Sequence, residues 1–404
     1  MRESIVPKRD QFSAAESALG YLYQTRAALL LALKKTRDNP DASVNIEKFD
    51  DISFDNSGEP TELIQTKHHL KKSGNLSNAS PDIWKTLRIW MERWQASEIS
   101  LPGAILSIVT TASTTSSSAA ALLCLEKRSP SDAKAQLEST ARKSTNKANA
   151  DIYEQFLGLS EDERSILVQS VYVFPNSPTI ADLGAEIENE LGLSVREKHK
   201  QPFRERLETW WFEQVIALLS GKRSAPIGCR ELQEHVLDLI EQFKRDALPL
   251  DYVLAEPPKD YVGLDDTRTF IKQLKLIAAS QKSIEYALID YYRAFEQRGR
   301  WVREELVLTN ELESYEHRLV EEWDRYVNRV RENFPIKNDG DSVKLGKLIY
   351  DWAQNDCKVY IRPNCQEPYV VRGSFHILAD DQKVGWHPDF VVRLKNLLAG
   401  GARP

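Results

Sequence analysis

The sequence predicts an α/β domain followed by a longer, mostly α-helical region. The first 125 residues alternate helix-like and strand-like patterns, which is typical of a small α/β domain. From about 126 to 356, nearly every window has helical periodicity and few strand signals. At 404 residues the chain is long enough for two or three domains. We therefore predict one domain at 1–125 and a mostly helical region at 126–404.

The elements of the first domain are expected in the order helix, three strands, helix and strand. A long helix is indicated by apolar residues at helical spacing, and a second helix by Ser80-Pro81 followed by an amphipathic pattern. The turn "DNSGEP" separates two of the strands, and the last strand is short and β-branched. In chain order the expected elements are 12–35, 42–49, 50–54, 61–67, 80–94 and 103–112.

The region after residue 126 reads as a series of helices. Ser160 with Glu163 three residues later predicts a capping box at one helix start. Long helices are expected at about 201–220, 228–246, 266–297 and 300–332, before a mixed tail. The last two carry a stripe of apolar and aromatic residues, which indicates either ordinary packing or a subunit contact.

Composition excludes several classes of protein. The net charge of −6 does not favour nucleic-acid binding by the whole molecule, so such binding would need a local patch. Four cysteines without close pairing fit a reducing compartment. The start lacks a signal-peptide pattern, and the most apolar run, 27–33, is far too short to span a bilayer. We expect a cytoplasmic protein with no membrane association.

Polar residues in the third expected strand predict a catalytic centre. Gln65 and Lys67 are two apart, so they share one face of the strand beside apolar neighbours. Asp51 opens the preceding strand and can meet that face across the turn. Strand alternation would place Glu47 on the same face as Asp51, which favours Asp51 over the adjacent Asp50, although either Glu47 or Asp50 could contribute to the metal site. An acid, an amide oxygen and an ammonium around one point suit phosphodiester hydrolysis with a divalent metal.

Four motifs carry a resemblance to a known family. The motifs "GYLYQ", "IEKFDDI", "LIQTKHH" and "DIWKTL" together resemble the PD-(D/E)xK nuclease domain of the CD-NTase-associated endonucleases of bacterial anti-phage operons. The resemblance covers roughly residues 12–125. It implies a restriction-endonuclease-like α/β fold, a DNA endonuclease activity on double-stranded DNA, and Mg²⁺ or Mn²⁺ as cofactor.

The resemblance also implies roles for individual residues. The catalytic aspartate of the family falls on Asp51, its Q-x-K pair on Gln65 and Lys67, and its strand-entry glutamate on Glu47. Asp51 and Gln65 are then the expected metal ligands. The family usually has a second acid where this chain has Gln65.

Three further residues are candidates for substrate binding. The glutamine of the first helix is Gln24, which is expected either to contact substrate or to be a buried hydrogen-bonding partner. Lys71 and Lys72 follow the candidate centre and would suit DNA phosphates, or simply a solvated loop. His68 and His69 between them suit either a metal or phosphate role or an ordinary core or surface position.

The remainder of the chain resembles a second family. The segments 206–243 and 372–390 resemble the C-terminal module of ABC three-component system effectors, which include the nuclease subunit of Lamassu-type defence. The resemblance implies two partners, an SMC-like coiled-coil ATPase and a small third subunit. It also implies an effector that partners hold inactive, and that is activated by release and homo-oligomerisation.

Two other functions stay open at this point. The chain could be a catalytically degenerate adaptor for a coiled-coil ATPase, or a nuclease gated by a nucleotide second messenger. The presence of both the acid and the lysine argues against the adaptor. The resemblance of the C-terminal half to the three-component module disfavours the messenger-gated nuclease.

Overall fold

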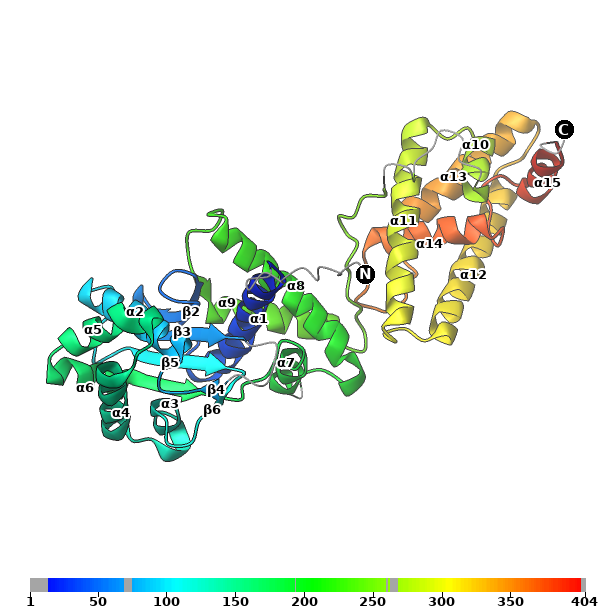
Figure 1. The fold of residues 1–404 in the computed structure, drawn as a ribbon. Coiled ribbons are helices and arrows are strands. Elements are labelled where there is room, and N and C mark those ends of the chain that lie inside the picture. The colour runs from blue at the N-terminus through cyan, green and yellow to red at the C-terminus, as the bar shows by residue number, and fades with distance from the viewer. Residues whose placement is uncertain (1–13, 69–74, 193, 259–260, 262–267, 401–404) are drawn as a thin grey trace, which may run out of the picture. The chain divides into compact units, whose positions relative to one another are not determined.

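A computed structural model describes residues 14–68, 75–192, 194–258, 261 and 268–400. The chain forms two compact units (Figure 1). Unit 1 runs to Val195 and includes Lys200–Asp238, and unit 2 comprises Arg196–His199 and the chain from Leu239 onward. The predicted division at residue 125 lies inside unit 1. No helix in the described ranges has the length and apolar character needed to cross a membrane.

Unit 1 is built on a six-stranded mixed sheet with the order β7-β5-β3-β2-β1-β8. Strands β1, β2 and β3 pair antiparallel, and β3, β5 and β7 pair parallel. A second, two-stranded sheet pairs β4 with β6. The strands are β1 (Ser43–Ile46), β2 (Ile52–Asn56), β3 (Glu59–Lys67), β4 (Asn75–Leu76), β5 (Ile105–Thr110), β6 (Ser113–Thr114), β7 (Val171–Phe174) and β8 (Ile227–Gly228).

Helices cover the sheet of unit 1. Helix α1 contacts β1, α7 and α8, while helices α2 to α6 pack around a core that includes Leu63, Leu106 and Val171. The helices are α1 (Ala14–Asp38), α2 (Pro81–Gln95), α3 (Ala119–Leu122), α4 (Pro130–Lys143), α5 (Ala150–Gly158), α6 (Glu161–Ser170), α7 (Leu183–Leu191), α8 (Lys200–Leu219) and α9 (Cys229–Gln242), which ends in unit 2. Short 3₁₀ turns are η1 (Leu125–Lys127), η2 (Lys147–Asn149) and η3 (Glu197–His199).

The structure corrects the expected strand at 42–49. Strand β1 ends at Ile46, and residues 47–51 form a loop before β2. Glu47 has a φ of 59°, in the left-handed region that a strand does not use. Because this segment is not extended, strand alternation does not apply to it. The argument that placed Glu47 and Asp51 on one strand face was therefore wrong.

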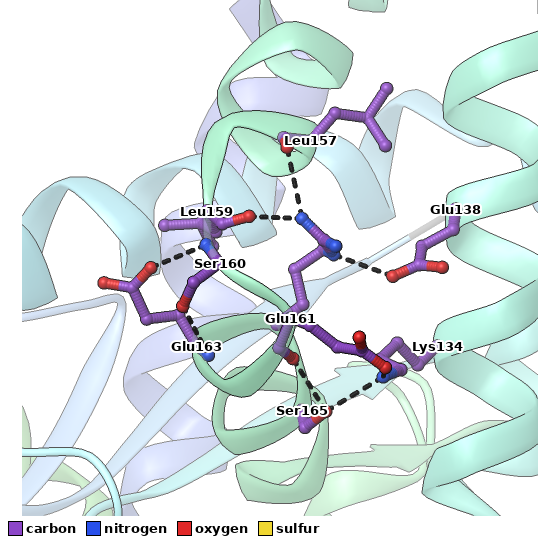
Figure 2. Close-up of polar contacts among 9 residues, drawn as sticks. Lys134, Glu138, Leu157, Leu159, Ser160, Glu161, Glu163 and Ser165 are labelled. Atoms are coloured by element: carbon purple, nitrogen blue, oxygen red, sulfur yellow. Dashed lines mark hydrogen bonds and ion pairs between the residues drawn. The ribbon is translucent and has the colours of Figure 1, made fainter.

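The predicted capping box is confirmed at the start of α6. The Ser160 hydroxyl accepts a hydrogen bond from the Glu163 backbone N–H at 3.2 Å, and the Glu163 carboxylate accepts one from the Ser160 N–H at 2.7 Å (Figure 2). The same turn is tied to α4, since Arg164 Nε donates to Glu138 at 2.7 Å. Helix α6 leads directly into β7, a strand that lies inside the region expected to be helical.

Unit 2 is helical throughout its regular elements, and the described part of the tail contains no strand. The predicted helix at 266–297 is two helices, because Ala278 adopts a φ of 48° and Ser280 caps the second one. The second helix continues past 297 to Arg303. The helices are α10 (Thr269–Leu276), α11 (Gln281–Arg303), α12 (Thr309–Asn333), α13 (Asp339–Asn355), α14 (Pro368–Asp380) and α15 (Phe390–Gly400).

The apolar stripe of the two long predicted helices is covered by unit 2 itself. Phe270, Leu274, Ile277 and Trp301 are completely buried, and Ile284 nearly so, all in one core that also receives α13 and α14. The remaining aromatic residues of the stripe are partly buried against the same core. Ordinary intramolecular packing therefore explains the stripe, and it is no longer an argument for a subunit contact.

A buried histidine makes the stability of unit 2 depend on pH. Burial, together with the charge of Arg372, lowers the pKa of His376 to about 3, and both ring nitrogens lack a hydrogen-bond partner among the described residues. The unfolded chain therefore binds a proton below the ordinary value of 6.5 that the folded unit does not bind. This histidine therefore takes no stability from the folded unit above pH 6.5. Below pH 6.5, the free energy of unfolding falls by about 1.4 kcal/mol per pH unit.

Replacing His376 with phenylalanine is expected to remove this loss. The ring lies among Phe270, Tyr350 and Trp386, so an apolar ring suits the position. Urea unfolding at pH 7.5 and pH 5.5 measures the effect. The variant should gain about 1 kcal/mol relative to the wild type on going to the lower pH. An equal pH response of the two proteins would show that His376 does not stay neutral in the folded unit.

Candidate active site

Strand β3 presents Gln65 and Lys67 on one face of the sheet, as the sequence predicted. They follow Leu63, which packs in the core with α2, and they pair with Ile108 and Thr110 of β5. The Gln65 side chain is only 4% exposed, and its Oε1 has no hydrogen-bond partner among the described residues. An unpaired buried amide oxygen is costly, so it marks a position where a ligand would be stabilised.

Asp51 lies at the end of the loop, next to β3. Its Oδ2 accepts hydrogen bonds from the backbone N–H of Thr66 at 2.8 Å and from the Thr66 hydroxyl at 2.9 Å. These bonds hold the carboxylate one residue from Gln65 along the strand. Both use the same oxygen, so Thr66 leaves Oδ1 of Asp51 unused.

Asp50 is a second carboxylate in the same loop, and strand alternation, which does not apply to this loop, favoured Asp51 over it. It is buried, with Oδ2 accepting from Trp90 Nε1 of α2 at 2.6 Å and Oδ1 accepting from the Asp51 backbone N–H at 3.0 Å. The pKa of Asp50 is raised to about 6, chiefly by burial, with the Asp51 carboxylate acting in the same direction. The Trp90 bond and the Lys67 ammonium act in the opposite direction. No sequence signal separates Asp50 from Asp51, because the loop conformation decides where each points.

Gln24 of α1 contacts the loop 47–51, including Glu47. Gln24 Nε2 donates to Glu47 Oε1 at 3.0 Å and also to the backbone carbonyl of Asp51. Gln24 is only 4% exposed, so of its two expected roles the structure favours the buried hydrogen-bonding partner over substrate contact. Glu47 is exposed, and its carboxylate is turned to Gln24.

Only some of the residues expected near the DNA are among the described residues. Lys71 and Lys72, like His69, lie outside the described residues. The His68 ring lies against the ring of Tyr23, with centroids 4.7 Å apart. This aromatic contact with α1 gives His68 a packing role.

The oxygens gathered here fit a hard divalent cation. Mg²⁺ takes carboxylate, amide and water oxygens, and usually keeps several waters. The Gln65 amide oxygen is free for such a ligand, and the Asp51 carboxylate is held by Thr66, the next residue of β3. Within the described ranges, no three His, Cys, Asp or Glu side chains gather as a ligand set. A metal at this point would therefore depend on Gln65 as well as on carboxylates.

Comparison with known proteins finds a family match for one part of the chain. Residues 270–394 match the family model of C-terminal domain 7 of the ABC-three component (ABC-3C) systems. Two solved structures are also similar, each at 12% sequence identity. The Moraxella osloensis Cap4 SAVED/CARF-domain containing receptor gives a TM-score of 0.37, with 69% of this chain and 68% of that chain covered. The Acinetobacter baumannii receptor of the same description, with the cyclic trinucleotide 3'3'3'-cAAA, gives 0.32, with 69% of each chain covered.

These comparisons bear on unit 2 more than on the candidate site. At such TM-scores the likeness to the Cap4 receptors supports no argument about this chain, and no curated protein matches it. The resemblance of the first domain to a nuclease therefore stands on its motifs alone. The matched range lies wholly within unit 2 and is narrower than the predicted 126–404. The three-component resemblance read from the sequence is thus confirmed for residues 270–394.

Proposed function

We propose that this chain is a metal-dependent DNA endonuclease that acts as the effector of an ABC three-component defence system. The observation that carries the nuclease proposal is the buried Gln65 oxygen without a partner, on the same face as Lys67, with the Asp51 carboxylate bound to the next residue, Thr66. An unpaired oxygen at this point is expensive in a purely structural protein. It is expected where a cation completes the site.

The residues have distinct roles in the proposed reaction. Asp51 and Gln65 would hold Mg²⁺ or Mn²⁺, which supplies a polarised phosphate oxygen and a more acidic water. Lys67 brings a fixed positive charge to the phosphate, where negative charge increases during attack. Glu47 remains a predicted contributor, and in the structure its carboxylate is bound by Gln24.

Assembly is the second part of the proposal. The match of residues 270–394 to an ABC-3C C-terminal domain supports protein partners for unit 2. We propose an SMC-like coiled-coil ATPase and a small third subunit as these partners. One centre cuts one strand, so a duplex break needs two chains. We therefore propose that partners hold the chain inactive and that released chains form the active homo-oligomer.

The test is cleavage of a supercoiled plasmid by the purified chain. Mg²⁺-dependent nicking or linearisation that EDTA stops is expected from the free chain, and less of it from the chain bound to its three-component partners. An RNA of similar length in a parallel reaction decides the substrate. A chain that cuts neither polymer, free or after partner release, would contradict the nuclease proposal and favour the adaptor.

The same assay separates the nucleotide-gated alternative. Two arms receive the free chain, one of them with a cyclic trinucleotide added. Cleavage only in the arm with the cyclic trinucleotide would replace partner release with a messenger as the trigger. Equal cleavage in both arms supports control by partners.

A further inference from the structure

The buried Asp50 carboxylate has a place in the candidate site that no motif assigns to it. It is 6% exposed, and a carboxylate at that depth is unfavourable unless donors surround it. Its two oxygens are used by donors from two elements, Trp90 of α2 and the backbone of Asp51. Asp50 therefore joins the main chain of a candidate metal ligand to a helix of the core.

The surroundings make this link specific. Trp90 is completely buried in the core with Leu63, the residue that precedes Gln65 on the same strand face. The Lys67 ammonium is near enough to favour the charged form of Asp50. Asp50 thus accepts a hydrogen bond from the Asp51 backbone and interacts electrostatically with Lys67. Its position is fixed by Trp90 of α2.

We propose that Asp50 is a positioning residue of this centre, which fixes the backbone of Asp51 through the Trp90 indole so that the Asp51 carboxylate is held ready for the metal. This inference rests on the proposed nuclease function. Residues that orient metal ligands typically change metal affinity or activity by 10–100-fold when replaced. A role in folding alone would lower stability and leave metal affinity unchanged.

Two variants break the link from opposite sides. In Asp50→Asn, one carboxylate oxygen becomes an NH₂ group, which faces a donor and accepts no hydrogen bond. In Trp90→Phe, the aromatic packing is largely kept but the indole donor is lost. Asp55→Asn is the matched control. Asp55 is a buried aspartate of β2 that accepts from Asn45 and from the Gly58 N–H, outside the loop.

The experiment measures two quantities on the full chain. The first is the Mg²⁺ concentration that gives half-maximal plasmid cleavage, with kcat and KM for DNA. The second is Mn²⁺ binding by calorimetry, which needs no cleavage. Asp50→Asn and Trp90→Phe should each weaken metal binding and raise the half-maximal Mg²⁺ concentration by about tenfold or more, with KM for DNA unchanged. Asp55→Asn should match the wild type in both quantities.

The outcomes distinguish this inference from the function on which it rests. If the wild type cuts and binds Mn²⁺ while the Asp50 and Trp90 variants behave like Asp55→Asn, the inference is wrong and the nuclease stands. If the wild type neither cuts nor binds Mn²⁺, the proposed function fails and the inference with it. If a variant does not fold, the other one decides, because each interrupts the link from Trp90 through Asp50 to the Asp51 backbone.

Discussion

Replacing Lys67 with alanine is expected to reduce Mg²⁺-dependent DNA cleavage by at least about 100-fold. The ammonium lies on the same strand face as the unpaired Gln65 oxygen, so its loss removes positive charge where the phosphate would bind. The strand itself should persist. The Lys67 carbonyl accepts from the Thr111 N–H at 3.3 Å and the Thr110 hydroxyl at 3.1 Å, and neither bond uses the side chain. Initial rates on supercoiled plasmid at saturating Mg²⁺ measure the effect.

A second lysine of unit 1 provides the control. Lys35 of α1 pairs with Glu62 at 3.0 Å, and Glu62 lies on β3, the strand that carries the candidate site. Lys35→Ala should cost at most about 1 kcal/mol of stability, because the pair is partly exposed, and should leave cleavage unchanged. Undiminished cutting by a folded Lys67→Ala protein would remove Lys67 from the active site.

Replacing Gly373 with alanine is expected to destabilise unit 2 by about 3 kcal/mol or more. Gly373 lies where α14 crosses α11, and a Cβ there would be 2.1 Å from the Asp290 carbonyl oxygen and 2.4 Å from the Ala294 Cβ. Neither atom is at the end of a flexible side chain, so one helix must move. The core on which unit 2 depends would then open. Thermal unfolding of the wild type and the variant measures the loss.

A glycine of α11 itself tests whether helix crossing, rather than glycine replacement, causes the effect. At Gly299 a Cβ would meet only the mobile end of Arg303, at 3.1 Å. Alanine is the better helix former, so Gly299→Ala should be neutral or stabilise by up to about 1 kcal/mol. Equal stability of the Gly373 and Gly299 variants would mean that the two helices are less closely packed than described.

Local patterns in the sequence determined much of unit 1. Apolar spacing located α1 and α2, and the turn at 55–60 located the β2–β3 hairpin. Ser160 and Glu163 located the start of α6. The shared face of Gln65 and Lys67 also follows from the sequence, because alternation in a strand is a property of neighbouring residues.

Contacts between distant segments decided the rest. β7 joins the sheet through β5, and β8 joins it through β1, although both lie where the sequence reads as helical. The loop 47–51 takes its shape from Gln24 of α1 and Trp90 of α2, which bind its backbone and Asp50. Side-chain hydrogen bonds from other elements can replace the ladder of a strand, and no periodicity within the loop records them. Which of the two adjacent aspartates faces Trp90 is therefore a property of the tertiary structure alone.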